Sequence, residues 1–372
     1  MAKTGLNNAM VRVENRKKLT NLLYEESGIT KQELARRLQL SAPTVNLLIQ
    51  QLEDDNLIFY QSSEKSSGGR IPNLVCFKYH AYITAGVEVQ KKRYRILLID
   101  LKYQILDETT VEKAFEPSAA YWENMRSSID ELLKKNNILP SSFLGIGVSV
   151  PGPVDQKSKT FSSMLLTLPQ YSYEEAERIM GCPLVLENDA NSAGFAEIWA
   201  SDELDNAAYL SVSKGVGGAL IHHREVMRGH NSLSGEFGHM IIVPNGKKCL
   251  CGRRGCLDMY CSTNVLSQYT EDSLQSFFEK KPESEALQKH WKQYLDHLII
   301  GVTNLSIMLD YPVIIGGEIV PFLQDEFDEF SKRVESMDVF KRNTPICRLS
   351  TMGVNGSAIG AALMVIHKVL DI

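Results

Sequence analysis

The sequence has no long hydrophobic run, since its 372 residues contain no stretch of about 18 or more consecutive apolar residues. This absence predicts that the chain has no transmembrane helix. The amino terminus also lacks an apolar segment followed by a small-residue cleavage site, which predicts no secretory signal peptide. The composition, 44% hydrophobic and 23% charged, is typical of a globular protein. We therefore expect a cytoplasmic protein of two or three domains.

Cysteine is scarce, with seven residues in the chain, yet Cys249, Cys251 and Cys256 lie within eight positions of one another. Glycines between them let the backbone turn tightly, and His239 lies ten residues upstream of the first. Three thiolates and one imidazole predict a closed, tetrahedral zinc site of the structural type, which leaves no position for a catalytic water. The alternative is a chance cluster of free or disulfide-bonded cysteines, which is less favoured in the cytoplasm.

Basic residues are unevenly distributed along the chain. Residues 1–80 hold 11 Lys and Arg against 8 Asp and Glu, whereas the whole chain has a net charge of −5. A mildly basic amino-terminal part on an acidic body indicates that only the first part contacts nucleic acid.

The first eighty residues contain three helical patterns. The first is at 13–26, and Thr30 and Glu33 form a capping box that predicts a second helix. Ser41 is the expected amino-terminal cap of a third helix. Two short helices joined by the tight turn 38–40 indicate a helix-turn-helix.

The third helix of such a unit lies in the major groove, and its polar residues are candidates to contact DNA. Two strands at 57–60 and 74–77 predict a wing around a polar tip, where an arginine can reach a phosphate or the minor groove. The candidate DNA-binding residues are Ser41, Thr44, Asn46, Gln50 and Arg70. The alternative is an ordinary three-helix packing module that mediates protein contacts.

From residue 81 onward, strands and helices alternate, which predicts two similar α/β halves with a cleft between them. The glycines at 215–218 are expected to form the turn of a hairpin. Strands are expected at 82–89, 95–100, 144–150, 183–187, 208–212, 219–222 and 312–317, and helices at 118–136, 190–200, 284–309 and 353–369.

Four motifs of the second half carry a family resemblance: Ser213-Lys-Gly-Val-Gly-Gly-Ala219, Gly235-Glu-Phe-Gly-His239, the cysteine cluster and Gly316-Gly317. Over about residues 80–372 the chain resembles the ROK family, which groups repressors, open reading frames and sugar kinases. Residues 1–80 resemble the head of its repressor branch, the xylose, glucose and N-acetylglucosamine regulators.

The resemblance implies an α/β, two-lobed, actin-like and hexokinase-like ATPase fold of the ribonuclease H-like kind. An all-α winged helix-turn-helix domain at 1–80, with its two wing strands, is expected to precede it. The N-terminal lobe is expected at 81–190. The C-terminal lobe, with the zinc-binding loop and an oligomerisation surface, is expected at 191–372. Family membership also implies homodimers or homotetramers.

A sugar site is implied by residue-by-residue similarity to the family kinases. Asn188 and Asp189 match an Asn-Asp pair whose aspartate accepts the proton of the reacting hydroxyl, so Asp189 is expected to be a vestigial base. Glu236 and His239 match two further sugar contacts, and His239 is expected to offer one ring nitrogen to zinc and the other to a sugar hydroxyl. Asp258 stands where the kinases have a glutamate. The alternative for Asn188-Asp189 is a helix cap.

The first phosphate-binding motif of the kinases is altered. Their strand ends in Asp-x-Gly-Gly-Thr, whereas the corresponding residues 88–92 read Glu-Val-Gln-Lys-Lys, without glycine. Side chains there are expected to crowd the ATP phosphates. The second phosphate loop keeps its glycines but has Lys214 in place of a threonine.

These features predict a sugar-responsive DNA-binding transcriptional regulator, a repressor of carbohydrate genes, and not an enzyme. Its expected partners are operator DNA, a sugar or sugar phosphate effector and a second copy of the chain. An active ATP-dependent sugar kinase is one alternative, and a DNA-binding dimer controlled by a protein partner is another.

Overall fold

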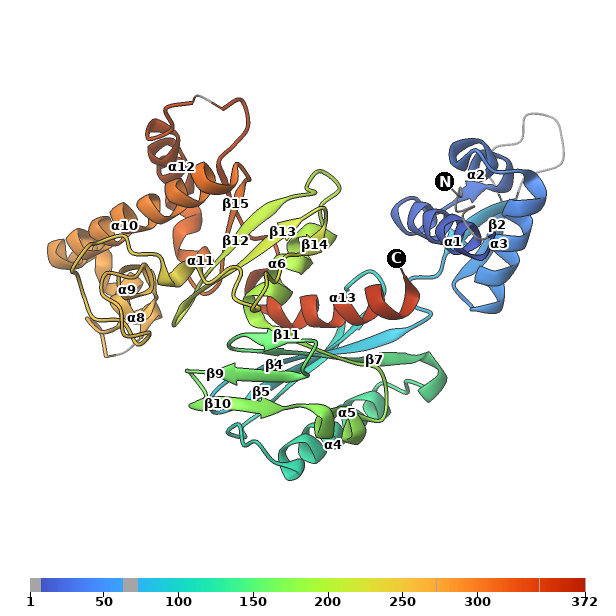
Figure 1. Ribbon diagram of the computed structural model, residues 1–372, viewed down its shortest axis with the longest axis horizontal. Helices are drawn as coiled ribbons and strands as arrows, with labels where there is room; N and C mark the ends of the chain where they lie inside the picture. Colours follow the sequence, from blue (N-terminus) through green and yellow to red (C-terminus); the bar gives the residue numbers. More distant parts are fainter. Residues whose placement is uncertain (1–7, 63–72, 272, 341, 372) are drawn as a thin grey trace, which may run out of the picture.

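The computed structural model describes residues 8–62, 73–271, 273–340 and 342–371. Its helices and strands form a small amino-terminal unit, here called the head (Asn8–Phe77), and a larger body with two sheets. In Figure 1 the head, in blue, lies beside the carboxyl end of α13, and the two sheets lie on either side of α13 and α6.

The head consists of three helices and a small sheet of strand order β1-β3-β2. The turn between the second and third helices places Gln39 in the left-handed region, with φ at 54°. Ser41 Oγ accepts a hydrogen bond from the Thr44 amide at 3.3 Å, which confirms it as the cap of the third helix. The elements are α1 (Asn8–Glu25), α2 (Lys31–Leu38), α3 (Ala42–Asp54), β1 (Ile29–Thr30), β2 (Ile58–Ser62) and β3 (Asn73–Phe77).

The expected capping box at α2 is only half present. Thr30 Oγ1 accepts from the Glu33 amide at 3.2 Å, as predicted. The Glu33 carboxylate, however, binds the guanidinium groups of Arg36 and Arg37 on the same helix. Charged donors one turn away form stronger hydrogen bonds than a backbone amide does, so the carboxylate turns toward them.

The first sheet of the body has the order β11-β7-β4-β5-β6. Its central strand β4 pairs in parallel with β7 and antiparallel with β5. α13 (Gly356–Leu370) lies on one face of this sheet, and α4 (Ala119–Lys135) and α5 (Glu174–Met180) lie on the other (Figure 1). The strands are β4 (Ile83–Val89), β5 (Tyr94–Asp100), β6 (Ile105–Val111), β7 (Phe143–Val150) and β11 (Leu184–Asn188). A separate three-stranded sheet contains β8 (Val154–Asp155), β9 (Thr160–Ser163) and β10 (Leu168–Ser172).

The second sheet repeats this topology with the order β14-β13-β12-β15-β16. In each sheet three consecutive strands are antiparallel, a fourth pairs in parallel with the first of them, and a fifth pairs in parallel with the fourth. The strands are β12 (Ala207–Val212), β13 (Val216–His222), β14 (Glu225–Val226), β15 (Val313–Gly316) and β16 (Cys347–Leu349). The repetition is the two-fold α/β architecture predicted from the sequence.

Helices cover the second sheet on both faces. α6 (Asp189–Trp199) packs on one face, and α10 (Glu285–Leu309) and α12 (Phe327–Ser336) pack on the other. Shorter helices connect the larger elements: α7 (Asp258–Cys261), α8 (Asn264–Ser267), α9 (Leu274–Lys280) and α11 (Val320–Leu323).

The expected glycine turn between β12 and β13 is displaced from its predicted position. Gly217 and Gly218 lie within β13, opposite Ser211 and Leu210 of β12, and the turn occupies residues 213–215. Only glycine fits at position 218 of this strand, because a Cβ there would lie 2.2 Å from the Phe237 ring.

The two lobes meet where α6 and α13 cross. Residues 190–198 of α6 are all buried, as is α13 from Ala358 to Ile366. Gly360 lies directly against the backbone of α6, so that a Cβ there would be 1.7 Å from the carbonyl oxygen of Ser192. The stretch Gly353–Leu370 is long and apolar enough to cross a membrane by length and composition alone. Most of it is buried between the lobes, as in the core helix of a globular protein.

We predict that Gly360→Ala destabilises the protein, although alanine favours an isolated helix by about 1 kcal/mol. The added methyl group cannot fit against Ser192, and overpacking of this kind costs about 1–3 kcal/mol. Denaturant unfolding measures the change. Ser357→Ala, on the same helix but only half-buried, is the control and is expected to be neutral or slightly stabilising. An unchanged or higher stability of Gly360→Ala would contradict the tight crossing.

Candidate functional site

The amino terminus of α6 lies at the carboxyl end of β11, between the two sheets. Asn188 is its cap, because its side-chain oxygen accepts from the Asn191 amide at 3.0 Å. The Asn188 side-chain nitrogen donates to the carbonyl of Gly152 at 3.1 Å and to Asp189 Oδ1 at 3.0 Å. Asn188 therefore does serve as a helix cap, and it also sets the position of the aspartate beside it.

Asp189 lies in an acidic environment at this helix end. Burial and, to a lesser extent, the nearby carboxylates of Glu88 and Glu236 raise the pKa of Asp189 to about 6. The Ala190 amide donates to Asp189 Oδ1 at 2.9 Å and opposes this shift. The structure thus brings together carboxylates from β4, from α6 and from the turn that contains Glu236.

An ion pair between Glu187 and Arg228 lies next to this end of α6. Glu187 is fully buried and accepts from the side-chain nitrogen of Asn191 at 3.0 Å. Arg228 binds the other oxygen of Glu187 at 2.6 and 2.8 Å. These hydrogen bonds from a guanidinium and an amide hold the Glu187 carboxylate at the end of β11.

His239 lies between the acidic cluster and the cysteines. Its Nδ1 is 3.7 Å from Cys249 Sγ, and its Nε2 is 3.8 Å from a carboxylate oxygen of Glu236. The imidazole therefore directs one ring nitrogen to the cysteines and the other to Glu236.

His239, Cys249, Cys251 and Cys256 form a compact donor cluster, with all four ligand atoms within 4.8 Å of one another. The Sγ atoms of Cys251 and Cys256 are 3.6 Å apart, which is too long for a disulfide. Metal–ligand bonds of zinc length in a tetrahedron place ligand atoms about 3.5–3.8 Å apart. The donor set and its spacing therefore fit one tetrahedral metal ion.

The backbone of the cysteine loop is folded tightly around this cluster. The Cys249 amide donates to the Arg253 carbonyl at 2.8 Å, and Lys248 and Arg254 form an isolated antiparallel bridge. Gly255 has φ at 84°, and a Cβ there would lie 1.8 Å from the Val243 carbonyl oxygen. Only glycine fits at this position, which explains the Gly-Cys pair of the motif.

Asp258 begins α7, two residues after Cys256, the last cysteine of the donor cluster. Its Oδ1 accepts from the Val216 amide at 2.7 Å, at the start of β13. Burial raises the pKa of Asp258, and the nearby His239 lowers it. Asp258 therefore faces the same region as His239, with one oxygen bound to the backbone of the glycine-rich turn.

That turn is held by its neighbours. The amide of Thr263 donates to the Ser213 carbonyl at 2.7 Å, and the Asn264 side chain donates to the Lys214 carbonyl at 2.7 Å. The amide of Glu318 donates to Ser213 Oγ at 3.0 Å.

A second ion pair lies at the end of β4. Arg95 of β5 binds Glu88 at 2.8 Å, and both side chains are 19% exposed. The same guanidinium donates to the side-chain oxygen of Asn355 at 2.5 Å and to the carbonyl of Val354 at 2.6 Å. Because residues 354 and 355 directly precede α13, Arg95 ties the first sheet to the helix that joins the lobes.

In the head, α3 presents a polar face to solvent. Ser41, Asn46 and Gln50 are exposed and Thr44 is partly exposed, so side chains on one face of α3 are available. The Gln50 side chain donates to Asp54 at 3.0 Å in this state. Arg70 of the predicted wing tip lies outside the described residues.

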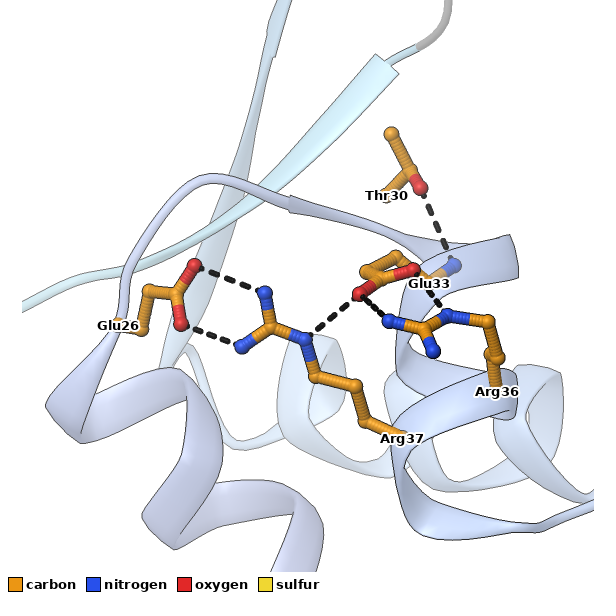
Figure 2. A network of polar contacts seen from close by, with 5 residues as sticks. All are labelled: Glu26, Thr30, Glu33, Arg36 and Arg37. Atoms are coloured by element: carbon orange, nitrogen blue, oxygen red, sulfur yellow. Dashed lines mark hydrogen bonds and ion pairs between the residues drawn. The ribbon is translucent and has the colours of Figure 1, made fainter.

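A charged network links α2 to Glu26, the residue that follows α1 (Figure 2). Arg37 forms two hydrogen bonds with Glu26, at 2.5 and 3.2 Å, and a third with Glu33 at 2.7 Å. Arg36 binds both oxygens of Glu33, and these two arginines lower the pKa of Glu33 to about 2. The network ties α2 to the connection after α1 and pairs two of the head's arginines with carboxylates.

The sequence profile of the ROK family matches residues 84–368, more than half of the chain. The chain belongs to the ROK family. A profile described as winged helix-turn-helix DNA-binding matches residues 13–58.

Relatives of this ROK protein include repressors and kinases. The xylose repressor of Bacillus subtilis is 27% identical over 97% of both chains. The N-acetylmannosamine kinase of Vibrio vulnificus is 30% identical over 46% of this chain and 63% of the kinase.

Solved structures share the fold. A ROK family transcriptional regulator, a homologue of the Escherichia coli Mlc protein, has a TM-score of 0.76 at 18% identity and covers 97% of this chain and 99% of its own. The ROK hexokinase of Thermus thermophilus has a TM-score of 0.64 at 23% identity and covers 78% of this chain and 99% of its own. These likenesses confirm the hexokinase-like fold.

In this ROK body, Nε2 of the predicted residue His239 lies 3.8 Å from the Glu236 carboxylate. Glu236 in turn lies near Asp189, and His239 lies near Asp258. Sequence reasoning missed Arg95. The signal was the register of the β4–β5 hairpin, which places Glu88 directly opposite Arg95. Opposite charges at directly facing positions stabilise a sheet.

We predict that Asp189→Asn stabilises this ROK protein at neutral pH. Because the pKa of Asp189 is raised from 3.8 to about 6, the unfolded chain loses this proton first, and stability falls as pH rises from 4 to 6. The amide keeps the acceptor but removes the charge, so the variant gains about 1–3 kcal/mol at pH 7 and almost nothing at pH 4.

Denaturant unfolding at several pH values measures this difference. Asp202→Asn removes an exposed carboxylate outside the site and is expected to change stability by less than about 0.5 kcal/mol. A gain for Asp189→Asn that is equal at pH 4 and pH 7 would contradict the raised pKa.

Proposed function

We propose that this ROK protein is a sugar-responsive transcriptional repressor of carbohydrate uptake or catabolism genes, and that it is not a sugar kinase. The observation that carries the proposal is the Glu88–Arg95 ion pair beside Asp189. Glu88 takes the position of the kinases' aspartate, and Gln90 and Lys91 after it replace the two glycines that receive ATP phosphates in the family kinases. The Glu88 carboxylate is engaged by Arg95, which also binds Asn355 and Val354.

The other polar side chains of the site can bind the hydroxyl groups of a sugar. Carboxylates and amides accept and donate hydrogen bonds to neighbouring hydroxyl groups, and the proposed contacts are Asn188, Asp189, Glu236, His239 and Asp258. The acidic surroundings of Asp189 favour a neutral sugar over a sugar phosphate, whose charge the carboxylates would repel. Xylose is the first candidate, because the Bacillus subtilis relative is named a xylose repressor.

The DNA-binding element is proposed to be α3, with Ser41, Thr44, Asn46 and Gln50 toward the major groove and Arg70 toward the backbone or minor groove. A homodimer or homotetramer would place two heads on operator half-sites about one or two helical turns apart. Such a regulator acts in the cytoplasm. A protein partner is a second candidate ligand of the body, besides the sugar.

The metal is proposed to be structural zinc. Three thiolates and one imidazole complete its coordination, so zinc holds the 235–258 region and supplies no reaction. Zinc at Nδ1 of His239 fixes the ring so that Nε2 faces Glu236, and both groups can then contact one sugar.

We expect the full-length protein to select a defined operator from random DNA. A binding monosaccharide should then change its operator Kd by roughly 5–150-fold, as coupled sites commonly do. Fluorescence anisotropy with D-xylose, D-glucose and N-acetylglucosamine measures this. Glu236→Gln should weaken the sugar effect, whereas Glu203→Gln, an exposed glutamate outside the site, should not.

Two results would sink this proposal. One is operator affinity that stays unchanged with every sugar that calorimetry shows to bind. The other is steady ATP-dependent phosphorylation of any sugar in the panel by the purified protein.

We expect elemental analysis of fresh protein to find about one zinc ion per chain. Cys251→Ser removes one ligand, and its free energy of unfolding should fall by about 2 kcal/mol or more, with a weaker sugar response. Cys182→Ser removes a free cysteine far from the cluster in sequence and should retain zinc. Zinc-free protein with the same stability and sugar response would refute the metal assignment.

A further inference from the structure

A partly buried tyrosine, Tyr24, makes several of the contacts that dock the head on the body of its own chain. Tyr24, in the last turn of α1, donates from its hydroxyl to the carbonyl of Leu101 at 2.6 Å. The same hydroxyl accepts from the indole nitrogen of Trp199 at 2.8 Å. The Tyr79 hydroxyl, in the connection between head and body, donates to the Tyr24 carbonyl at 2.5 Å.

Aromatic packing surrounds these hydrogen bonds. The Tyr24 ring contacts Phe77, Tyr79 and Trp199 edge-on, with centroids 5.4, 5.7 and 5.7 Å apart. On its other side Trp199 meets His367 of α13 at 6.1 Å. Buried residues of α1 and α3 belong to the same continuous apolar core as those of α6 and α13. The head is therefore packed against the body as well as tethered to it.

Trp199 is the last residue of α6, and Asp189 is its first. One helix of about 16 Å thus extends from the carboxylates of Asp189, Glu88 and Glu236 to the head. Both of its ends are held. Asn188 caps the first turn, and Arg224 donates to the carbonyl of Ile198 in the last turn and to those of Ser201 and Leu204 after it. Because these hydrogen bonds keep both ends of α6 from fraying, the helix is expected to move as one rigid element.

A second connection runs through α13 in parallel. The buried Glu197 of α6 accepts hydrogen bonds from the amides of Thr351 and Met352 and from the Ser350 hydroxyl, just before α13. At the far end of α13, Asp371 pairs with Lys17 of α1 at 3.0 Å. Both helices that cross between the lobes therefore end against α1.

We propose that the Trp199–Tyr24 contact is the joint through which sugar binding alters operator binding. This inference rests on the proposed function, because it requires a ligand at Asn188 and Asp189. A sugar that displaces the amino terminus of α6 moves Trp199 with it and changes the docking of α1. In an oligomer, the angle of each docked head sets the separation of the two α3 helices.

The hydrogen bond between Trp199 and Tyr24 favours two discrete positions of the head, docked and released. The Tyr24 hydroxyl has its donor and its acceptor satisfied in the docked state, and burial raises its pKa. A small shift of Trp199 leaves the indole N–H without its partner inside a packed interface, which is costly. The head is consequently either docked or released to solvent, and intermediate positions are disfavoured.

Two conservative variants test the joint. Trp199→Phe and Tyr24→Phe each keep an aromatic ring and remove the hydrogen bond between them. The matched controls are Trp291→Phe, whose indole donates to Glu326 at 2.8 Å, and Tyr94→Phe, whose hydroxyl donates to Asn124 at 2.8 Å. Both control residues are buried in the body and carry comparable hydrogen bonds.

The measured quantity is the ratio of operator Kd with and without D-xylose, or the panel sugar that is active on the wild type. We expect Trp199→Phe and Tyr24→Phe to bind sugar and operator but to bring this ratio close to 1. The double variant should lose no more than either single one, because both remove the same contact. The two controls should keep the wild-type ratio.

The outcomes separate the two proposals. A wild-type ratio of 1 with every sugar that binds overturns the proposed function, and this inference with it. A wild-type response that persists in Trp199→Phe and Tyr24→Phe overturns the joint alone. Equal losses in the controls would show a general effect of weakened packing and would likewise overturn the joint.

Discussion

The body depends on the close crossing of α6 and α13. Each helix covers one sheet, and the two helices contact each other through their backbones where Gly360 meets Ser192. A side chain larger than hydrogen at 360 would push α6 and α13 apart and strain the contacts between them, such as those of Glu197 with the segment before α13. Interiors at this packing density transmit displacement instead of absorbing it. The crossing therefore both stabilises the lobes and ties their movements together.

The two ends of α6 have contrasting chemistry. At its amino terminus lie carboxylates and amides suited to a polyhydroxylated ligand, and the helix dipole there partly offsets the charge of Asp189. At its carboxyl terminus lie aromatic rings and a guanidinium that satisfies the free carbonyls. Polar recognition and apolar docking are thus placed on one rigid element. The cysteine loop contributes at the first end only, by orienting His239 toward Glu236.

The sequence predicted the fold class, the repeated α/β halves, the cap at Ser41 and the association of His239 with the cysteines. Each rests on a local signal: hydrophobic periodicity, a capping residue or a ligand motif. The role of Glu33 was predicted incorrectly, because a capping box does not reveal that arginines one turn later compete for the carboxylate. Tyr24 was missed since its partners are distant in sequence and only the packed structure brings them together. Arg95 was missed because its pairing with Glu88 depends on the register of the β4–β5 hairpin. The sugar contacts remain predictions that no bound ligand tests.

The position of α13 in the chain also affects how the protein forms. β4 is among the first strands of the body to be synthesised, yet one face of its sheet is covered by a helix encoded at the other end of the body. Contacts of such long sequence separation are slow to establish, because the intervening chain must first be ordered. Until α13 arrives, the nascent first sheet exposes apolar surface, the situation in which larger proteins aggregate or engage chaperones. The internal contacts of the head, by contrast, lie within residues 8–77, so it can form long before the body that restrains it.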